Sequence, residues 1–173
     1  MIYLDNAATS HKKPVAVVSA VTNYLTVVNA NPGRSGHLLS AGAARIVFDA
    51  REALARLLNV ADSRQLIFTK NATESLNIVL RGWLRPGDHV VTTSLEHNSV
   101  MRPLRHLEQA LPCELTVVGS GRDGLVDPAA IGAALRPDTR LVVVNHASNV
   151  CGTIAPLAEI RAAIGETPLL VDG

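Results

Sequence analysis

The sequence predicts an α/β fold, a three-layer sandwich in which helices cover both faces of a mostly parallel sheet, preceded by N-terminal helices. From residue 66 onward, short β-branched runs alternate with helical stretches, the order that strand–helix–strand units with parallel strands produce. The runs are almost wholly apolar, as strands covered on both faces must be. A length of 173 residues with 47% hydrophobic content agrees with one globular core.

Two amphipathic helices are predicted before the sheet. The first follows Pro14, whose missing N–H costs nothing in a first helical turn. Its apolar positions are Val18, Val21, Leu25 and Val28. The second is expected to begin with Ser40 as its N-cap. It carries an apolar stripe and a polar stripe, and both follow the same helical period. The apolar stripe is Val47, Ala50, Leu54 and Leu57, and the polar stripe is Arg45, Asp49, Glu52 and Arg56.

Five strands follow in the prediction. They are LIFT at 66–69, HVVTT at 89–93, ELTVV at 114–118, RLVVVN at 140–145 and PLLV at 168–171. The intervening helices carry Leu76, Val79, Leu80 and Trp83, then Val100, Leu104 and Leu107, then Ile131 and Leu135, then Leu157 and Ile160. The sequence therefore indicates a single domain over 1–173, with an N-terminal arm and helix at 1–40 and the core at 41–173.

The charge pattern and composition exclude several classes of partner. Sixteen basic and fifteen acidic residues are scattered along the chain, so neither a nucleic acid nor an anionic membrane is an expected partner. The chain shows no leader pattern and no membrane-spanning run, which indicates a cytoplasmic protein. Cys113 and Cys151 lack metal-ligand spacing, and no metal site is expected.

The last residues, Val171-Asp172-Gly173, stand at the carboxyl end of a predicted strand. In an open α/β sheet this is the edge where ligands bind and where a loop is expected to follow. We therefore expect the chain to hold an incomplete domain.

Loops at this edge are the place to look for ligand-binding groups. Ala72 and Thr73 lie in the turn after LIFT and open a helix, where free N–H groups and a hydroxyl suit a phosphate. His97 follows HVVTT, Asn149 follows RLVVVN, and Asp172 follows PLLV. Together these groups fit a ligand with a phosphate, a flat ring and a basic nitrogen. A plain N-cap, a capping histidine and a loop-capping aspartate are the structural alternatives.

A glycine pattern offers a competing interpretation. Gly119, Gly121 and Gly124 spell G-x-G-x-x-G after the strand ELTVV, which by letter is a dinucleotide-binding fingerprint. That fingerprint must open a helix at once, whereas Asp127-Pro128 is the better helix start here. The context therefore argues against a nicotinamide or flavin site, and no P-loop pattern occurs either.

Six strings in the sequence resemble the cysteine desulfurases and their class V aminotransferase relatives. They are YLDNAAT at 3–9, NPGRSGH at 31–37, FTKNATESLN at 68–77, EHNSVMRPL at 96–104, NHASNVCGTIAPLAEI at 145–160 and LLVDG at 169–173. They occur in the family's order over the whole chain.

This resemblance implies a pyridoxal-phosphate enzyme of fold type I, of whose large domain the chain is the N-terminal part. Ala72 and Thr73 would hold the phosphate, and His97 would stack on the pyridine ring. Asn149 would lie near the phenolic oxygen and the substrate carboxylate, and Asp172 would pair with the ring nitrogen and keep it protonated. The resemblance also implies a homodimer, with Asn6, Arg34 and His37 near the mouth of the site. The implied reaction takes sulfur from L-cysteine to give alanine and an enzyme-bound persulfide, for a sulfur-acceptor protein.

The sequence also departs from the family's pattern. The family's Schiff-base lysine lies downstream of the Val-Asp pair, and the lysines here are Lys12, Lys13 and Lys70. The nucleophilic cysteine and the carboxylate-binding arginine are likewise expected further along, so this chain by itself is expected to be inactive. Transamination, epimerisation and selenocysteine cleavage share these motifs. A non-catalytic truncated paralogue is a further alternative.

Overall fold

The computed structural model describes residues 1–34 and 36–173, so that one position of the NPGRSGH string, Ser35, lies outside the described residues. The chain divides into two compact units, Met1–Phe68 and Thr69–Gly173. The predicted boundary at 40/41 falls inside the first unit and stays a prediction of how the domain is organised. Among the described helices, none is both long and apolar enough to cross a membrane.

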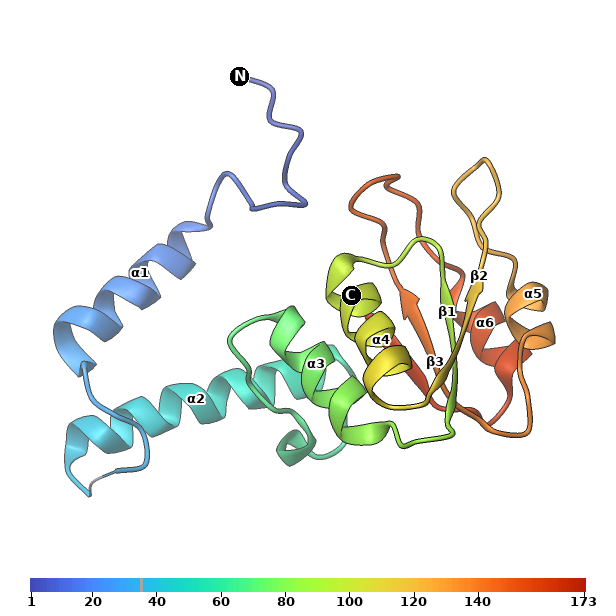
Figure 1. Cartoon of the computed structure of the whole chain (residues 1–173). Helices are drawn as coiled ribbons and strands as arrows, with labels where there is room; N and C mark the ends of the chain where they lie inside the picture. Colours follow the sequence, from blue (N-terminus) through green and yellow to red (C-terminus); the bar gives the residue numbers. More distant parts are fainter. Residues whose placement is uncertain (35) are drawn as a thin grey trace. The chain divides into compact units, whose positions relative to one another are not determined.

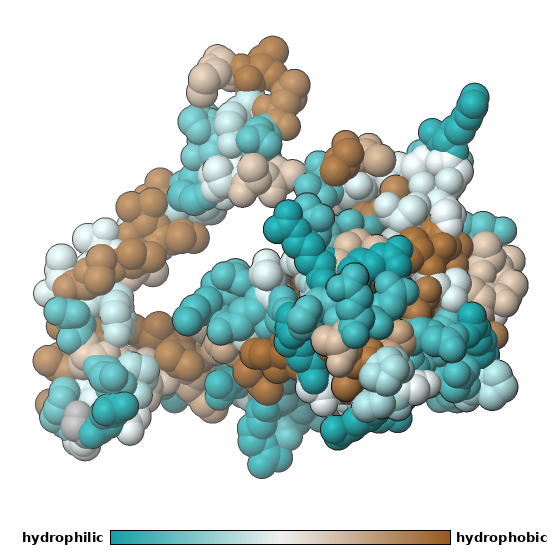
Figure 2. Space-filling model, viewed as in Figure 1, coloured by the Kyte–Doolittle hydropathy of each residue, from teal (hydrophilic) through white to brown (hydrophobic). Residues whose placement is uncertain are grey.

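The first unit contains the two predicted helices. They are α1, Val15–Asn23, continued by a π-helical turn at Tyr24–Val28, and α2, Leu38–Leu57, followed by a 3₁₀ turn at Ser63–Gln65. Side chains of α1 are exposed, and Figure 2 shows hydrophobic (brown) residues along it. The predicted apolar stripe of α2 is also largely exposed, with Leu57 at 77%.

The predicted N-cap of α2 is wrong. Helix α2 begins three residues earlier than expected, at Leu38, and His37 is its N-cap, with the ring Nδ1 accepting from the Ser40 N–H at 3.2 Å. Ser40 is buried within the helix, and its hydroxyl donates to the Asn31 carbonyl at 2.8 Å. Serine was favoured because its hydroxyl is a common cap, but a histidine with a free Nδ1 lone pair accepts the same kind of bond.

The predicted strand at 66–69 is also wrong. These residues are irregular, and Ile67 and Phe68 are 82% and 47% exposed. A strand needs a neighbour for its backbone N–H and C=O groups, and no strand of the described residues pairs with this segment. The apolar run indicated a buried segment, but an apolar run does not specify its partner. Instead the guanidinium of Arg51 lies 5.5 Å from the Phe68 ring centroid.

The second unit is a three-layer α/β sandwich, as predicted (Figure 1). Four parallel strands form one sheet in the order β2-β1-β3-β4. The strands are β1 at His89–Thr93, β2 at Glu114–Val118, β3 at Thr139–Asn145 and β4 at Leu169–Asp172. The helices are α3 at Ala72–Trp83, α4 at Asn98–Ala110, α5 at Pro128–Ala133 and α6 at Leu157–Ile164. These bounds confirm the other four strands and the helices between them.

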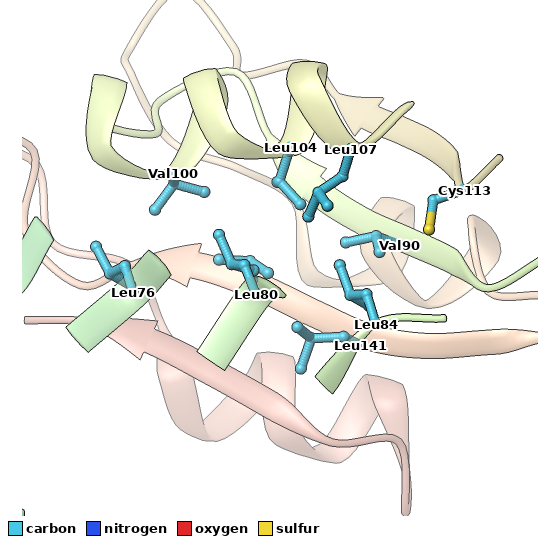
Figure 3. Packing of buried hydrophobic residues seen from close by; sticks show 10 residues of the cluster. Leu76, Leu80, Leu84, Val90, Val100, Leu104, Leu107, Cys113 and Leu141 are labelled. Carbon is cyan, nitrogen blue, oxygen red and sulfur yellow. The ribbon is translucent and has the colours of Figure 1, made fainter. Parts of the chain in front are cut away.

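Alternate residues of the central strands build two separate cores. Val90 and Leu141 pack with α3 and α4 on one face of the sheet (Figure 3). Val143 belongs to the same core. Val91 and Val142 pack with α5 and α6 on the other face. Successive side chains of a strand point to opposite faces, and helices cover both faces here, so the central residues of these strands, at 90–91 and 141–144, are all apolar.

Three polar residues of β1 are also buried, namely His89, Thr92 and Thr93. His89 is fully buried at the start of β1, and its two ring nitrogens lie 2.8 Å from the hydroxyls of Thr139 and Thr116. Burial is the main cause that lowers the pKa of His89, which keeps the ring neutral at physiological pH. The residue therefore links β1 to both neighbouring strands through hydrogen bonds, without a buried charge.

Candidate functional site

The turn before α3 is built by reciprocal capping. Asn71 is the N-cap, with its Oδ1 accepting from the Glu74 N–H at 2.9 Å. The carboxylate of Glu74 in turn accepts from the Lys70 N–H at 2.7 Å. A side-chain contact of 2.6 Å between the hydroxyls of Thr69 and Ser75 closes the turn. The local sequence therefore fixes where the helix starts.

This cap leaves two backbone donors available. The N–H groups of Ala72 and Thr73 occupy the first two helical positions, where no intrahelical acceptor exists. Both residues are exposed. Thr73 also carries a hydroxyl group, which is a further hydrogen-bond donor. The positive end of the helix dipole adds to their attraction for an anion. The N-cap alternative is thus correct for Asn71, and it is compatible with a phosphate on Ala72 and Thr73.

His97 is the N-cap of α4. Its Nδ1 accepts from the Ser99 N–H at 3.1 Å and lies 2.7 Å from the Ser99 hydroxyl. An Nδ1 that accepts from a backbone N–H places the proton of the neutral ring on Nε2. The capping alternative is therefore what the geometry shows. It also fixes the orientation of an exposed ring, which a stacking role requires.

Thr73 and His97 line the same hollow, of about 480 Å³, between α3 and α4. The lining residues are Thr73, Asn77, Arg81, His97, Asn98, Ser99, Arg102, Pro103 and His106. They include two arginines and no carboxylate, so the hollow suits a negatively charged group. Ala72, Asn149 and Asp172 are not among them, and the structure does not bring all the predicted residues into one hollow.

Asp172 ends β4 and is half-buried. Its Cα pairs with that of Asn145 at the end of β3, and its carbonyl accepts from the His146 N–H at 2.8 Å. Because the strands are parallel, the ends of β1, β3 and β4 lie at one edge of the sheet. His97 therefore follows β1, and Asp172 ends β4, at the same edge of the sheet, with β3 between these two strands.

Asn149 lies in a tight loop after β3. The buried Ser148 organises it, because its hydroxyl accepts from the Cys151 N–H at 3.1 Å and its N–H donates to the Thr153 carbonyl at 2.9 Å. Gly152 closes the turn with a φ of +71°, a conformation that favours glycine. Asn149 is exposed in this loop.

Sequence reasoning missed one residue of this edge, Glu96. One carboxyl oxygen accepts from the Thr93 hydroxyl at 2.6 Å and from the Asn145 N–H at 2.9 Å, and the other oxygen is buried without a partner among the described residues. Burial is the main cause that raises the pKa of Glu96, and the nearby Asp172 charge raises it further. Its position directly before His97 in a strand-end loop was the available signal.

Asn6, Arg34 and His37 belong to the first unit. Asn6 Oδ1 accepts from the His11 N–H at 3.2 Å, His37 caps α2, and Arg34 is exposed. These contacts are local, and the placement of the three residues at the mouth of a site stays a prediction.

The glycine run does not form a dinucleotide site. Gly121 and Gly124 lie in a turn after β2, where Gly124 has a φ of +72°. Helix α5 begins only at Pro128, with Asp127 as its N-cap. The helix N-terminus that would hold a pyrophosphate therefore does not follow the glycines.

The fold defines a class of protein: a parallel α/β sheet with an exposed helix N-terminus and polar loops after its strands. Sequence comparison refines this class. The family model described as aminotransferase class-V matches residues 2–173. A probable cysteine desulfurase of Methanothermobacter thermautotrophicus is 42% identical over 161 residues, which cover 92% of this chain and 39% of the relative. Cysteine desulfurase IscS of Pseudomonas savastanoi pv. phaseolicola is 39% identical, with 95% and 41% covered.

Solved structures agree. The apo structure of cysteine desulfurase from Thermococcus onnurineus NA1 matches with a TM-score of 0.91 and 32% identity, covering 99% of this chain and 44% of that one. The structure of SspA in complex with cysteine matches with a TM-score of 0.89 and 27% identity, covering 99% and 50%. The chain belongs to the aminotransferase class-V family. It spans 39% and 41% of the length of the two curated relatives named above.

Proposed function

We propose that these 173 residues supply the cofactor-binding part of a pyridoxal-phosphate-dependent cysteine desulfurase. The enzyme would act on L-cysteine to give L-alanine and an enzyme-bound persulfide. The observation that carries the proposal is the shared hollow of Thr73 and His97, which has basic side chains, no carboxylate in its lining and an open helix N-terminus beside it. The similarity to proteins named cysteine desulfurase supports the choice of reaction.

The donor set fits the three chemical parts of pyridoxal phosphate. The N–H groups of Ala72 and Thr73 and the Thr73 hydroxyl match a phosphate, and the capped imidazole of His97 offers a flat ring held in one orientation. The half-buried carboxyl of Asp172 matches a basic ring nitrogen. At the same edge of the sheet, one buried carboxyl oxygen of Glu96 has no hydrogen-bond partner among the described residues.

Each residue then has one task. Ala72 and Thr73 bind the phosphate, His97 packs against the ring face, and Asn149 orients the substrate carboxylate. Asp172 holds a proton on the ring nitrogen through a charge-assisted hydrogen bond. When bound, pyridoxal phosphate supplies an electron-withdrawing ring that stabilises the negative charge left on an amino acid after deprotonation.

We further propose a cytoplasmic homodimer that passes sulfur to an acceptor protein. Exposed apolar side chains on α1, including Val15 at 80% and Leu25 in the following turn at 60%, support an interface in the first unit. Cys113 and Cys151 are both free thiols, in keeping with a reducing compartment. The cysteine held by the SspA structure supports cysteine as the substrate over the other class V reactions.

Pyridoxal phosphate is expected to bind the purified chain, and Asp172→Asn is expected to weaken that binding about tenfold or more, since charge-assisted hydrogen bonds contribute about 1.5–3 kcal/mol. Absorbance titration gives the Kd. Asp138→Asn is the matched control, because Asp138 is exposed and precedes β3 at the opposite edge of the sheet. Equal affinities of the two variants would contradict the role of Asp172.

Pyridoxal without its phosphate is expected to bind the chain more weakly than pyridoxal phosphate. This comparison tests whether the turn at Ala72 and Thr73 binds the phosphate.

The 173-residue chain by itself is expected to release no sulfide from L-cysteine when pyridoxal phosphate is added. Its lysines are Lys12, Lys13 and Lys70, and Lys70 lies in the capping turn of α3, on the phosphate side of the proposed site. The measurement is a colorimetric sulfide assay beside a complete cysteine desulfurase. Sustained sulfide release by the chain would show that this assignment of roles is wrong.

A further inference from the structure

The carboxyl group of Glu96 occupies an unusual position for an acidic side chain. One oxygen accepts two hydrogen bonds, from the Thr93 hydroxyl at 2.6 Å and the Asn145 N–H at 2.9 Å. The other oxygen is buried and has no partner among the described residues. An unpaired buried polar atom is costly, and folded proteins retain few of them.

The bond to Asn145 continues the sheet where strand pairing stops. The paired residues of β1 and β3 end at Val91 and Val142, and β1 itself ends at Thr93. Beyond that point the Glu96 oxygen accepts from the Asn145 N–H in place of a backbone carbonyl. The Asn145 side chain returns a bond of 3.3 Å to the Leu95 carbonyl. The loop that carries His97 is therefore fastened to β3 from both sides.

The same bond connects His97 to Asp172 in two steps. Glu96 precedes His97 directly, and the strand residue that it holds, Asn145, is the one whose Cα pairs with Asp172 in β4. A shift of the Glu96 side chain would move the imidazole relative to the strand end that carries the carboxylate.

The surroundings of the Glu96 carboxyl act on its pKa in opposite directions. Burial is the main cause that raises the pKa of Glu96, while its bonds from Thr93 and Asn145 lower it and the Asp172 charge raises it. A glutamine has nearly the same shape as a protonated glutamate and keeps an oxygen that accepts both bonds.

We propose that Glu96 is a positioning residue of the cofactor site, whose side-chain oxygen fixes the loop bearing His97 to the end of β3 beside Asp172. The cofactor role of Glu96 rests on the proposed function, whereas the hydrogen bonds that hold the loop to β3 are a property of the chain alone. Two readouts therefore test it: hydrogen exchange of the Asn145 amide in the ligand-free chain, and the Kd for pyridoxal phosphate.

In Glu96→Ala, exchange of the Asn145 amide is expected to accelerate about tenfold or more, and pyridoxal phosphate to bind about tenfold more weakly, as loss of one buried hydrogen bond predicts. Glu96→Gln is expected to restore both values to within about threefold of the wild type, because the acceptor oxygen is kept. Glu166→Ala, at an exposed glutamate, is the control and is expected to change neither.

An unchanged Asn145 exchange rate in Glu96→Ala overturns the proposal, and so does a Kd no weaker than that of the control. A glutamine variant as impaired as the alanine variant also overturns it, since the ionised form would then be required. If the wild-type chain binds no pyridoxal phosphate, the proposed function fails together with the cofactor role of Glu96. The exchange rates then still decide whether the loop is fastened as described.

Discussion

Replacing Val142 with aspartate is expected to abolish folding of the Thr69–Gly173 unit. Val142 is fully buried in the central strand β3, where it packs between the sheet and the helices α5 and α6. A buried charge without a partner costs several kcal/mol, about 5 kcal/mol or more, which rivals the total stability of an ordinary domain. Circular dichroism should show the loss of helical signal at neutral pH.

The matched control is Val150→Asp. Val150 is 85% exposed in the loop after β3, so an aspartate carboxylate at this position stays in contact with water. The control is expected to change the free energy of unfolding by less than about 0.5 kcal/mol. A folded Val142→Asp chain with a wild-type melting temperature would contradict the two-core packing.

Replacing Leu80 with alanine is expected to lower the free energy of unfolding by about 3 kcal/mol. Leu80 is fully buried where α3 meets α4 and the sheet, among Leu76, Leu84 and Leu104 (Figure 3). The truncation removes apolar contacts and leaves a cavity that close-packed neighbours fill only in part.

Urea unfolding followed by tryptophan fluorescence measures this loss. The chain has one tryptophan, Trp83, in the same helix, with the Arg140 guanidinium 4.8 Å from its ring centroid. Ile78→Ala is the control, since Ile78 lies on α3 but is 58% exposed, and a change within about 0.5 kcal/mol is expected. Equal losses in the two variants would show that burial does not determine the effect.

Much of the second unit was predictable because its apolar residues follow two clear periods. The β-branched runs at 89–93 and 140–145 became strands, and the 3.6-residue spacing of Val100, Leu104 and Leu107 became one face of α4. The run at 66–69 failed because a strand depends on a partner, which local composition does not encode. The start of α2 failed because an imidazole competed with a hydroxyl as the capping acceptor.

The candidate site was predictable to the level of its loops. Parallel strands bring their carboxyl ends to one edge, so site residues were expected there. The structure places His97 and Asn149 after β1 and β3, and Asp172 at the end of β4. Whether they share one hollow depends on loop conformations and side-chain directions, which periodicity does not specify. Glu96 escaped notice because its importance comes from a hydrogen bond to Asn145, 49 residues away in sequence.

The two cores also set a rule for the length of the central strand. Leu141 and Val143 face one helical layer, while Val142 and Val144 face the other. One residue inserted or deleted inside β3 would turn every following side chain toward the opposite layer. The same slip would carry the Asn145 N–H out of reach of its acceptor. Spacing within this strand is therefore as strict a requirement as the chemistry of its side chains, whereas the exposed turn near Gly121 has room to vary in length.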